Sequence, residues 1–460
     1  MVIRGNQKMD FKRPACFKAY DIRGRVPTEL NPRLGRDIGR AFAAVFSVKK
    51  VVVGYDIRLS SREITEALTS GLIDMGVDVV GLGLCGTEEI YHAAFSLEDQ
   101  GVDGGIMVTA SHNPADYNGM KIVIKGARPV SGDSGLFTMA DLIAENRLPS
   151  VSSKKGRQTA ISGKNSYIEH LLDYVQLDQL QPLKVVVNSG NGCAGPVVDL
   201  LEDRLPFRFV KLHHQPDGTF PNGVPNPLLP DNREETSRMV REHGADMGIA
   251  WDGDFDRCFF WDEQGNFIEG YYLVGLLAME LLRKEPGGKI LHDPRLIWNT
   301  QDLVRAAGGI PVMTKTGHAF IKARMRQEDA VYGGEMSAHH YFRDFGYCDS
   351  GMVPWLLVSQ LLSRCGLPLS QLVAERIAAF PVSGEINSRV ADPDRVIAHI
   401  EEVYAGGEKD FTDGLSIAFP EYRFNVRKSN TEALLRLNVE TRGDVVLLQE
   451  KTREILALIK

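Results

Sequence analysis

Short apolar runs alternate with amphipathic stretches along most of the chain. The run at 50–54 precedes an amphipathic stretch over 61–75, and the run at 77–81 precedes another over 87–97. Short runs rich in β-branched residues are typical of strands, whereas apolar residues spaced three or four positions apart indicate helices. The alternation therefore predicts mixed α/β domains with mainly parallel strand pairing.

The same alternation restarts further along the chain. Strand-like runs recur at 184–187, 246–251, 288–292 and 311–313. We expect three related α/β units from these restarts. The last part of the chain differs, because 423–439 predicts a hairpin and 445–459 a closing amphipathic helix. A smaller α+β domain is therefore expected at the C-terminus.

Polar segments indicate where these units end. The stretch 148–156 is rich in serine and lysine, and further boundaries are expected near 261–269 and 380–384. The expected domains are 1–150, 157–260, 261–375 and 380–460.

Composition narrows the class of protein. The 460 residues are 43% hydrophobic and 25% charged, with a formal net charge of −7, as is typical of a globular protein in water. The acidic balance argues against nucleic-acid and membrane partners. No apolar run approaches the ~20 residues of a membrane span. The first residues lack the apolar core of a signal peptide, and six scattered cysteines suit reduced thiols, so we expect a cytoplasmic protein.

The hexapeptide at 109–114 places a hydroxyl at a sharp turn between two strand-like runs. Pro114 fixes its own φ and drives Asn113 away from the helical region. We therefore expect Ser111 on an exposed loop, with His112 beside it and Lys121 just beyond. A serine is a weak nucleophile, so another part of the chain has to activate it.

An acidic loop follows the strand-like run at 246–251. Asp252, Asp254 and Asp256 alternate with other residues, so their carboxylates can turn towards one hard cation such as Mg²⁺. Arg257 adds a positive charge suited to an anionic ligand. An EF-hand is disfavoured because Arg257 stands where that loop needs glycine. A solvated acidic turn remains the alternative.

Two further loops offer polar groups at the ends of predicted strands. The loop at 333–340 contains Glu335, Ser337 and two histidines, which suit sugar hydroxyls. A structural turn or a zinc-binding His339–His340 pair is the alternative. The short stretch 315–318 contributes Lys315 and His318, for which a surface lysine and a packed histidine are the default.

Two more turns could bind an anion. The hairpin tip at 427–431 combines two cations, two hydroxyls and an amide, and a tip of this kind can present an anion-binding nest. A solvated turn is equally compatible with it. Near the start of the chain, Tyr20 and Arg23 lie at another turn.

Four motifs occur together in a fixed order: T-A-S-H-N-P at 109–114, D-G-D-F-D-R at 252–257, G-E-M-S-A-H-H at 334–340 and R-K-S-N-T-E at 427–432. In these motifs the chain resembles the α-D-phosphohexomutases, most closely their bacterial phosphomannomutase branch, from about Phe17 to the C-terminus. The resemblance implies three related α/β domains and a smaller α+β domain around a central cleft, with one loop from each domain.

The resemblance also implies roles for individual residues. Ser111 would carry the phosphoryl group, and together with the three aspartates it would bind Mg²⁺. The implied catalytic residues are Ser111, His112, Lys121, Arg257, His318 and Arg23. The implied substrate-binding residues are Tyr20, Lys315, Glu335, Ser337, His339, Arg427, Ser429, Asn430 and Thr431. The metal ligands are Ser111, Asp252, Asp254 and Asp256.

The implied reaction interconverts mannose 1-phosphate and mannose 6-phosphate, through a phosphoserine enzyme and a hexose 1,6-bisphosphate, and would feed GDP-mannose synthesis. Lys121 or His318 would take the proton. A phosphoglucomutase or dual-specificity mutase is the alternative, followed by a phosphoglucosamine mutase or a Mg²⁺-dependent sugar phosphatase. The hexose phosphate is the expected partner, in a monomer or a homodimer.

Three departures from the family pattern bear on the choice of sugar. Ala338 and Ala433 replace a common glycine and a common proline, and Arg295 is a tentative substitute for a lysine.

Overall fold

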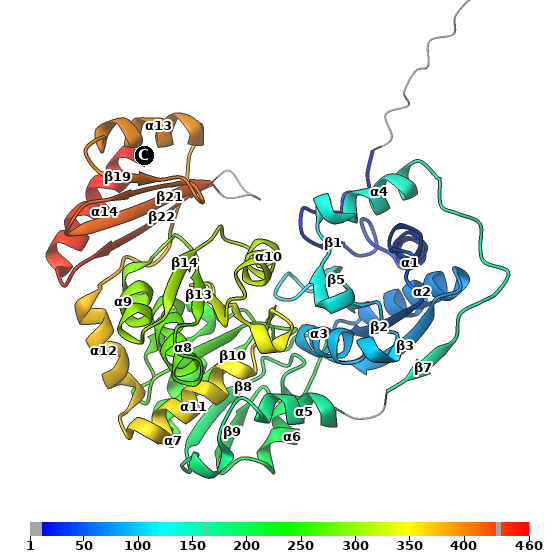
Figure 1. Ribbon diagram of the computed structural model, residues 1–460, viewed down its shortest axis with the longest axis horizontal. Helices are drawn as coiled ribbons and strands as arrows, with labels where there is room; N and C mark the ends of the chain where they lie inside the picture. Colours follow the sequence, from blue (N-terminus) through cyan, green and yellow to red (C-terminus); the bar gives the residue numbers. More distant parts are fainter. Residues whose placement is uncertain (1–11, 162–163, 429–433, 460) are drawn as a thin grey trace, which may run out of the picture.

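The computed structural model describes residues 12–161, 164–428 and 434–459 and consists of four units, each built on its own sheet (Figure 1). The first unit has a seven-stranded sheet in the order β1-β5-β4-β2-β3-β7, with β6 paired to β5. Its elements are β1 (Ile22–Arg25), α1 (Pro32–Phe46), β2 (Lys50–Tyr55), α2 (Ser61–Asp74), β3 (Asp78–Leu84), α3 (Thr87–Ser96), β4 (Gly104–Val108), β5 (Tyr117–Ile124), β6 (Arg128–Pro129), α4 (Leu136–Ala144) and β7 (Gln158–Ala160).

The second and third units each have a five-stranded sheet, in the orders β12-β11-β10-β8-β9 and β14-β13-β15-β16-β17. The second contains α5 (Asn165–Leu172), β8 (Lys184–Asn188), α6 (Gly195–Glu202), β9 (Arg208–Leu212), α7 (Glu234–His243), β10 (Met247–Trp251), β11 (Cys258–Trp261) and β12 (Phe267–Ile268). The third contains α8 (Gly270–Lys284), β13 (Lys289–His292), α9 (Trp298–Ala306), β14 (Ile310–Met313), α10 (His318–Glu328), β15 (Tyr332–Gly334), β16 (His340–Phe342), β17 (Cys348–Asp349), α11 (Val353–Cys365) and α12 (Leu369–Ala379).

The fourth unit is a five-stranded antiparallel sheet in the order β18-β22-β21-β20-β19. It contains β18 (Ile386–Arg389), α13 (Pro393–Val403), β19 (Glu408–Asp410), β20 (Leu415–Ala418), β21 (Tyr422–Lys428), β22 (Leu434–Thr441) and α14 (Val445–Ile459). The expected hairpin and closing helix are β21–β22 and α14. The prediction of three related α/β domains and a smaller α+β domain is confirmed.

The sheets of the first three units share a five-strand pattern, which corrects the expectation of mainly parallel pairing. In each, three parallel strands (β3-β2-β4, β9-β8-β10 and β14-β13-β15) lie beside two antiparallel ones (β5-β1, β11-β12 and β16-β17), and the first sheet adds β7, parallel to β3, and β6, antiparallel to β5. Parallel neighbours need a long crossover, whereas antiparallel neighbours are joined by a short loop. The motif loops are those short connections, so the strand that follows each of them runs back along the sheet.

Two expected boundaries divide hydrogen-bonded sheets. β12 pairs with β11, so the second sheet extends past the boundary expected at residue 260. β7 pairs with β3, so residues 158–160 belong to the first sheet although 157 was expected to begin the second domain. We propose boundaries after β7 and after β12 instead.

Apolar packing joins three of the units and leaves the fourth with its own core. One buried cluster runs from Ile90 and Tyr91 on α3, through the second unit, to Leu277 on α8 and Leu357 on α11. The fourth unit has a separate cluster around Phe424, in agreement with its position at one end of the molecule in Figure 1. All six cysteines are free thiols, and five of them are buried.

No single helix in the described part of the chain is long and apolar enough to cross a membrane; α11 and α12, bent by 97°, reach that length and composition only as a pair.

Candidate active site

The three α/β units place their motif loops at equivalent positions. Residues 109–116 join β4 to β5, residues 252–257 join β10 to β11, and residues 335–339 join β15 to β16. Each loop begins at the carboxyl end of the third parallel strand of its sheet, where α/β folds place their ligand sites. In the fourth unit, residues 429–433 lie between β21 and β22.

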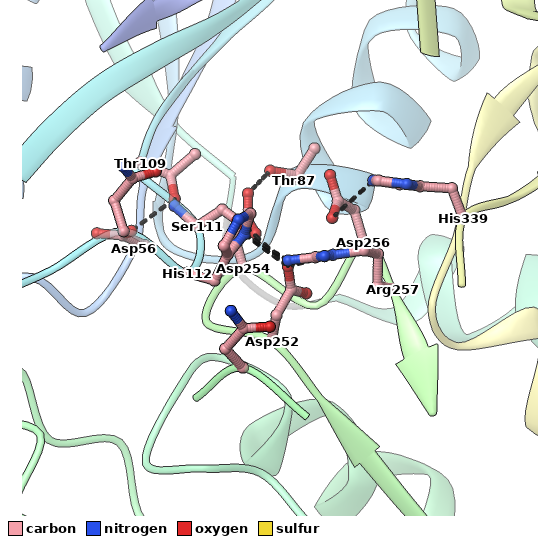
Figure 2. A network of polar contacts seen from close by, with 12 residues as sticks. Asp56, Thr87, Thr109, Ser111, His112, Asp252, Asp254, Asp256, Arg257 and His339 are labelled. Carbon is pink, nitrogen blue, oxygen red and sulfur yellow. Dashed lines mark hydrogen bonds and ion pairs between the residues drawn. The ribbon is translucent and has the colours of Figure 1, made fainter. Parts of the chain in front are cut away.

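Ser111 is buried, not exposed as we expected. Its side chain is covered, with 3% of the residue accessible, and its φ is 50°. Ser111 Oγ donates a 2.7 Å hydrogen bond to Asp252 Oδ2 and lies 3.0 Å from His112 Nδ1 (Figure 2). The acidic loop of the second unit covers it so closely that a Cβ on Gly253 would lie 2.6 Å from the Ser111 carbonyl oxygen. Packing between units therefore buries a loop that is polar in sequence.

The three aspartates form a buried pocket of oxygens that suits a divalent cation. Asp252, Asp254 and Asp256 are at most 2% exposed, and each offers an oxygen within 4.8 Å of the others. The Oδ1 atom of each has no hydrogen-bond partner among the described residues. An unpartnered buried carboxylate oxygen is costly, so the residues present fit a hard metal ion.

Two cations from the protein balance part of this negative charge. Lys121 Nζ lies 2.6 Å from Asp254 Oδ2 and also contacts Asp256 Oδ2. Arg257 donates from Nε and Nη2 to Asp252 Oδ2, at 2.9 and 2.7 Å. Burial and the neighbouring Asp254 carboxylate nevertheless raise the pKa of Asp256 well above its usual range. The two side-chain cations therefore leave negative charge that a metal ion could neutralise.

The histidines near this pocket are neutral at pH 7. Desolvation and the Arg257 cation lower the pKa of His112 to about 4. Desolvation and Lys322 lower the pKa of His318 to about 4. The pKa of His339 lies well below its usual range because of burial and Arg257. Each of the three rings therefore keeps one unprotonated nitrogen at pH 7, which a general base requires.

In the third loop, the side chain of Glu335 already has partners. Its Oε1 accepts from the Gly317 N–H at 3.0 Å, and its Oε2 accepts from the Tyr341 hydroxyl at 2.6 Å. Ser337 lies half-buried on the same loop. The next residue, Ala338, has a φ of 70°, a conformation that favours glycine and explains why glycine suits this position.

The two adjacent histidines of this loop diverge. His339 Nε2 lies 3.8 Å from Asp256 Oδ1, beside the metal pocket. His340 is fully buried and its Nδ1 lies 2.7 Å from the Tyr332 hydroxyl. The structure therefore brings only His339 to the site, and the alternative of a His339–His340 zinc pair is wrong.

The remaining predicted residues of the first and third units lie around these loops. Arg23 donates to Asn113 Oδ1 at 2.5 Å and to Asp21 Oδ2 at 2.6 Å, so it contacts the Ser111 loop. The Tyr20 ring packs edge-on against His318, with ring centroids 6.1 Å apart. Lys315 is exposed, and its Nζ lies 4.8 Å from the centroid of the Phe320 ring.

The fourth loop is described only at its first residues. Arg427 is buried, and its Nη2 donates to Glu385 Oε2 at 3.0 Å. Arg295 is also buried, pairs with both oxygens of Asp293, and lies 3.7 Å from the same Glu385 oxygen. The predicted residues Ser429, Asn430 and Thr431, and the departure Ala433, lie outside the described residues.

Several buried polar side chains next to the site were not predicted from the sequence. Asp56 and Arg58 support the Ser111 loop, and the Thr87 hydroxyl donates to Asp254 Oδ2. Glu88 joins α3 to α5 and to the loop before α11. The sequence did contain a signal for Asp56 and Arg58. They come directly after a predicted strand, as the residues of the motif loops do.

Four domain models of a single protein family together match nearly the whole chain. The models of phosphoglucomutase/phosphomannomutase alpha/beta/alpha domains I, II and III match residues 14–145, 165–265 and 269–380, and the model of the C-terminal domain matches residues 385–457.

Individual relatives match at high identity. A phosphomannomutase of Salmonella montevideo is 59% identical over 452 residues, covering 96% of this chain and 98% of its own. A Xanthomonas campestris protein named "phosphohexose mutases" is 57% identical over 451 residues, covering 97% and 99%. The solved structure of a phosphoglucomutase/phosphomannomutase family protein from Burkholderia thailandensis has a TM-score of 0.86 and 33% identity, covering 96% and 97% of the two chains.

Proposed function

The chain belongs to the phosphoglucomutase/phosphomannomutase family, and on this basis we propose that it is a phosphomannomutase that interconverts mannose 1-phosphate and mannose 6-phosphate. The enzyme is an isomerase that works by intramolecular phosphotransfer. A hexose phosphate is its substrate, and a hexose 1,6-bisphosphate is the proposed intermediate.

One observation carries this proposal. Ser111 Oγ lies 2.7 Å from Asp252 Oδ2, at the edge of a buried pocket in which three aspartates each have one oxygen without a hydrogen-bond partner among the residues that the structure describes. A serine phosphorylated at this position would add its own oxygens to that pocket. The site would thereby serve phosphoryl transfer, which depends on positioning and charge neutralisation more than on covalent chemistry by the protein.

We propose that Asp252, Asp254 and Asp256 bind Mg²⁺ together with the phosphate on Ser111. When bound, the ion neutralises charge on the phosphoryl oxygens as a Lewis acid. Arg257 adds a fixed positive charge, because its guanidinium is held against Asp252. Lys121 acts as a second cation, since it is ion-paired to Asp254.

In the proposed step a hydroxyl of the bound sugar attacks the phosphorus of phosphorylated Ser111. The bond between phosphorus and Ser111 Oγ breaks as the new bond to the sugar oxygen forms, and Ser111 Oγ takes up a proton to become a hydroxyl again. The sugar hydroxyl loses its proton to a neutral base, for which His318 suits better than Lys121, because the carboxylates hold Lys121 as an ammonium group. The Ser111 hydroxyl then attacks the phosphorus at the other end of the resulting bisphosphate. The bond from that phosphorus to the sugar oxygen breaks, the sugar oxygen takes up a proton, and Ser111 is phosphorylated again.

The remaining predicted residues would bind the sugar phosphate. Glu335 and Ser337 are proposed to contact sugar hydroxyls, with Tyr20, Lys315 and His339 around them. Arg427 and residues 429–431 are proposed to bind the phosphate that is not reacting. Because this phosphate lies at either end of the sugar in turn, a clamp based on charge suits it better than a pocket of fixed shape.

A dual-specificity mutase is the second candidate. The Xanthomonas relative at 57% identity has the broader name "phosphohexose mutases". The departures Arg295 and Ala338 both lie near the proposed sugar contacts, so they bear on the choice of sugar and not on phosphoryl transfer.

We further propose a cytoplasmic monomer or homodimer without nucleic-acid or membrane partners.

The test is conversion of mannose 1-phosphate to mannose 6-phosphate with Mg²⁺ and a trace of hexose 1,6-bisphosphate, with glucose 1-phosphate in parallel. We expect the Ser111→Ala variant to lose turnover and the exposed Ser70→Ala control to keep it. Turnover by Ser111→Ala would exclude the phosphoserine mechanism. Release of inorganic phosphate as the main product would indicate a sugar phosphatase, and equal kcat/KM on both sugars a dual-specificity mutase.

A further inference from the structure

Arg58 lies under the Ser111 loop and binds its backbone at four points. Nη1 donates to the carbonyl oxygens of Pro114 and Tyr117 at 2.7 and 2.9 Å. Nη2 donates to the carbonyl oxygens of Ser111 and Asn113 at 2.9 and 2.5 Å. The residue is 3% exposed, so these charge-assisted bonds form away from water.

Asp56 holds Arg58 and also reaches the other side of Ser111. Its Oδ1 accepts from the Arg58 N–H at 3.0 Å, and its Oδ2 accepts from the Thr109 hydroxyl at 2.6 Å. The Thr109 oxygen in turn accepts from the Ser111 N–H at 2.8 Å, as Figure 2 allows the reader to follow. The backbone N–H and C=O of Ser111 are therefore both held by the Asp56–Arg58 pair.

This double restraint coincides with an unfavourable backbone conformation. Ser111 has a φ of 50°, in the left-handed region that is unfavourable for a residue with a Cβ. A conformation of that kind persists only where the surroundings determine it, and it is common at functional sites. Within the described part of the chain, the hydrogen bonds of the Arg58 guanidinium go to the Ser111 loop and the first residue of β5. Its other contacts are the ion pair with Asp56, at 3.4 Å, and the ring of Phe220.

We propose that Arg58 is a positioning residue for phosphoryl transfer, which fixes the direction of the Ser111 Oγ by holding the carbonyl groups of residues 111, 113, 114 and 117. This inference rests on the proposed function. The same Oγ has to donate a phosphoryl group to one end of the sugar and accept one from the other end. A misplacement of about 1 Å can cost a reaction of this kind about 10²-fold.

The test compares Arg58→Lys with Arg62→Lys in the full-length protein. Lysine keeps the positive charge of Arg58, but its single ammonium group cannot reach four carbonyl groups in the planar geometry of a guanidinium. Arg62 is the matched control, since it lies close by in sequence with a side chain that is 77% exposed. We expect kcat of Arg58→Lys to fall about 10²-fold with an unchanged KM for the sugar phosphate, and Arg62→Lys to behave as wild type.

A second readout isolates the step itself. The dephosphorylated enzyme is mixed with hexose 1,6-bisphosphate, and phosphorylation of Ser111 is followed by intact mass. We expect this rate to fall with kcat in Arg58→Lys, while the thermal midpoint changes little. Thr109→Val, which keeps the side-chain shape and removes the hydroxyl between Asp56 and the Ser111 N–H, should slow the same step if Arg58→Lys does not fold.

The outcomes separate this inference from the proposed function. Turnover by Ser111→Ala would overturn the proposed function. If Ser111→Ala is inactive but folded Arg58→Lys phosphorylates Ser111 at the wild-type rate, only the role of Arg58 is overturned. A rise in KM with unchanged kcat would also overturn it, because Arg58 would then serve substrate binding and not transfer.

Discussion

The Ser111 hydroxyl and the Asp252 carboxylate are joined by a 2.7 Å hydrogen bond across the interface between the first two α/β units. The nucleophile proposed from one loop therefore lies against the metal pocket proposed from another. Because the two loops belong to different sheets, the position of Ser111 relative to the three aspartates depends on how the two units pack.

Replacing Lys121 should strengthen metal binding and weaken turnover. Its ammonium group occupies the side of the pocket formed by Asp254 and Asp256, so a divalent cation has to compete with it. We expect Lys121→Met to bind Mn²⁺ more tightly in an EPR titration of the free ion. We also expect kcat to fall about 10²-fold or more, because a cation of the proposed transfer step is lost.

Lys125→Met, at an exposed position just beyond the same strand, is the control. Unchanged Mn²⁺ affinity in Lys121→Met would show that the lysine and the metal do not compete.

Adding one methyl group to the acidic loop should separate the two loops. In Gly253→Ala the new Cβ would lie 2.6 Å from the Ser111 carbonyl oxygen, which is also held by Arg58. We expect kcat to fall about 10²-fold with little change in the thermal midpoint. Gly406→Ala is the matched control, because a Cβ there meets nothing within 4 Å. Wild-type kcat in Gly253→Ala would mean that the spacing of the loops does not limit transfer.

Glu88 should make stability fall as pH rises. Burial raises its pKa from 4.5 to about 8, even though it accepts hydrogen bonds from Tyr167 and from the backbone of Gly351 and Met352. Between these values the folded protein keeps a proton that the unfolded chain releases. The contribution of Glu88 to the free energy of unfolding is therefore present below about pH 4.5 and is lost progressively between about pH 4.5 and about pH 8.

The variant Glu88→Gln should remove this contribution, since glutamine has a similar shape and does not ionise. We expect its thermal midpoint, measured against wild type, to improve steadily between about pH 5 and about pH 8. The exposed Glu63→Gln variant should follow the wild-type curve. Parallel pH profiles for Glu88→Gln and wild type would contradict the prediction.

The buried carboxylate of Glu440 should fix the fourth unit to the third. Glu440 is fully buried and accepts from Arg423 at 2.8 Å, from the Ile297 N–H at 2.7 Å, and from the Tyr271 hydroxyl. Removing it leaves the buried Arg423 unpaired, at a cost of about 3–5 kcal/mol. We expect Glu440→Ala to lower the free energy of unfolding by about this amount in a urea titration. Asp394→Ala breaks an exposed pair in the same unit and should cost at most about 1 kcal/mol. Equal effects of the two variants would show that Glu440 does not hold the fourth unit to the third.

Local pattern was sufficient to predict most elements and the loops between them. The run at 50–54 became β2, the amphipathic stretch 61–75 became α2, and the C-terminal segment became α14. These predictions succeeded because hydrophobic periodicity follows the geometry of a helix or strand within a few turns. The direction of the strand after the motif loop was predicted poorly in the three α/β units, since strand pairing is not a local property, whereas the hairpin β21–β22 of the fourth unit was predicted correctly.

The sequence by itself determined which chemical groups are present and in which order: the serine at 111, the alternating carboxylates at 252–256, and the polar turns after predicted strands. Only the tertiary structure decided that Ser111 is buried, that one oxygen of each aspartate lacks a hydrogen-bond partner in the described part of the chain, and that Arg58 binds the backbone of the Ser111 loop. The reason is physical. Burial, desolvation and hydrogen-bond pairing depend on residues that approach from other units, and the spacing of residues along one segment carries no record of them.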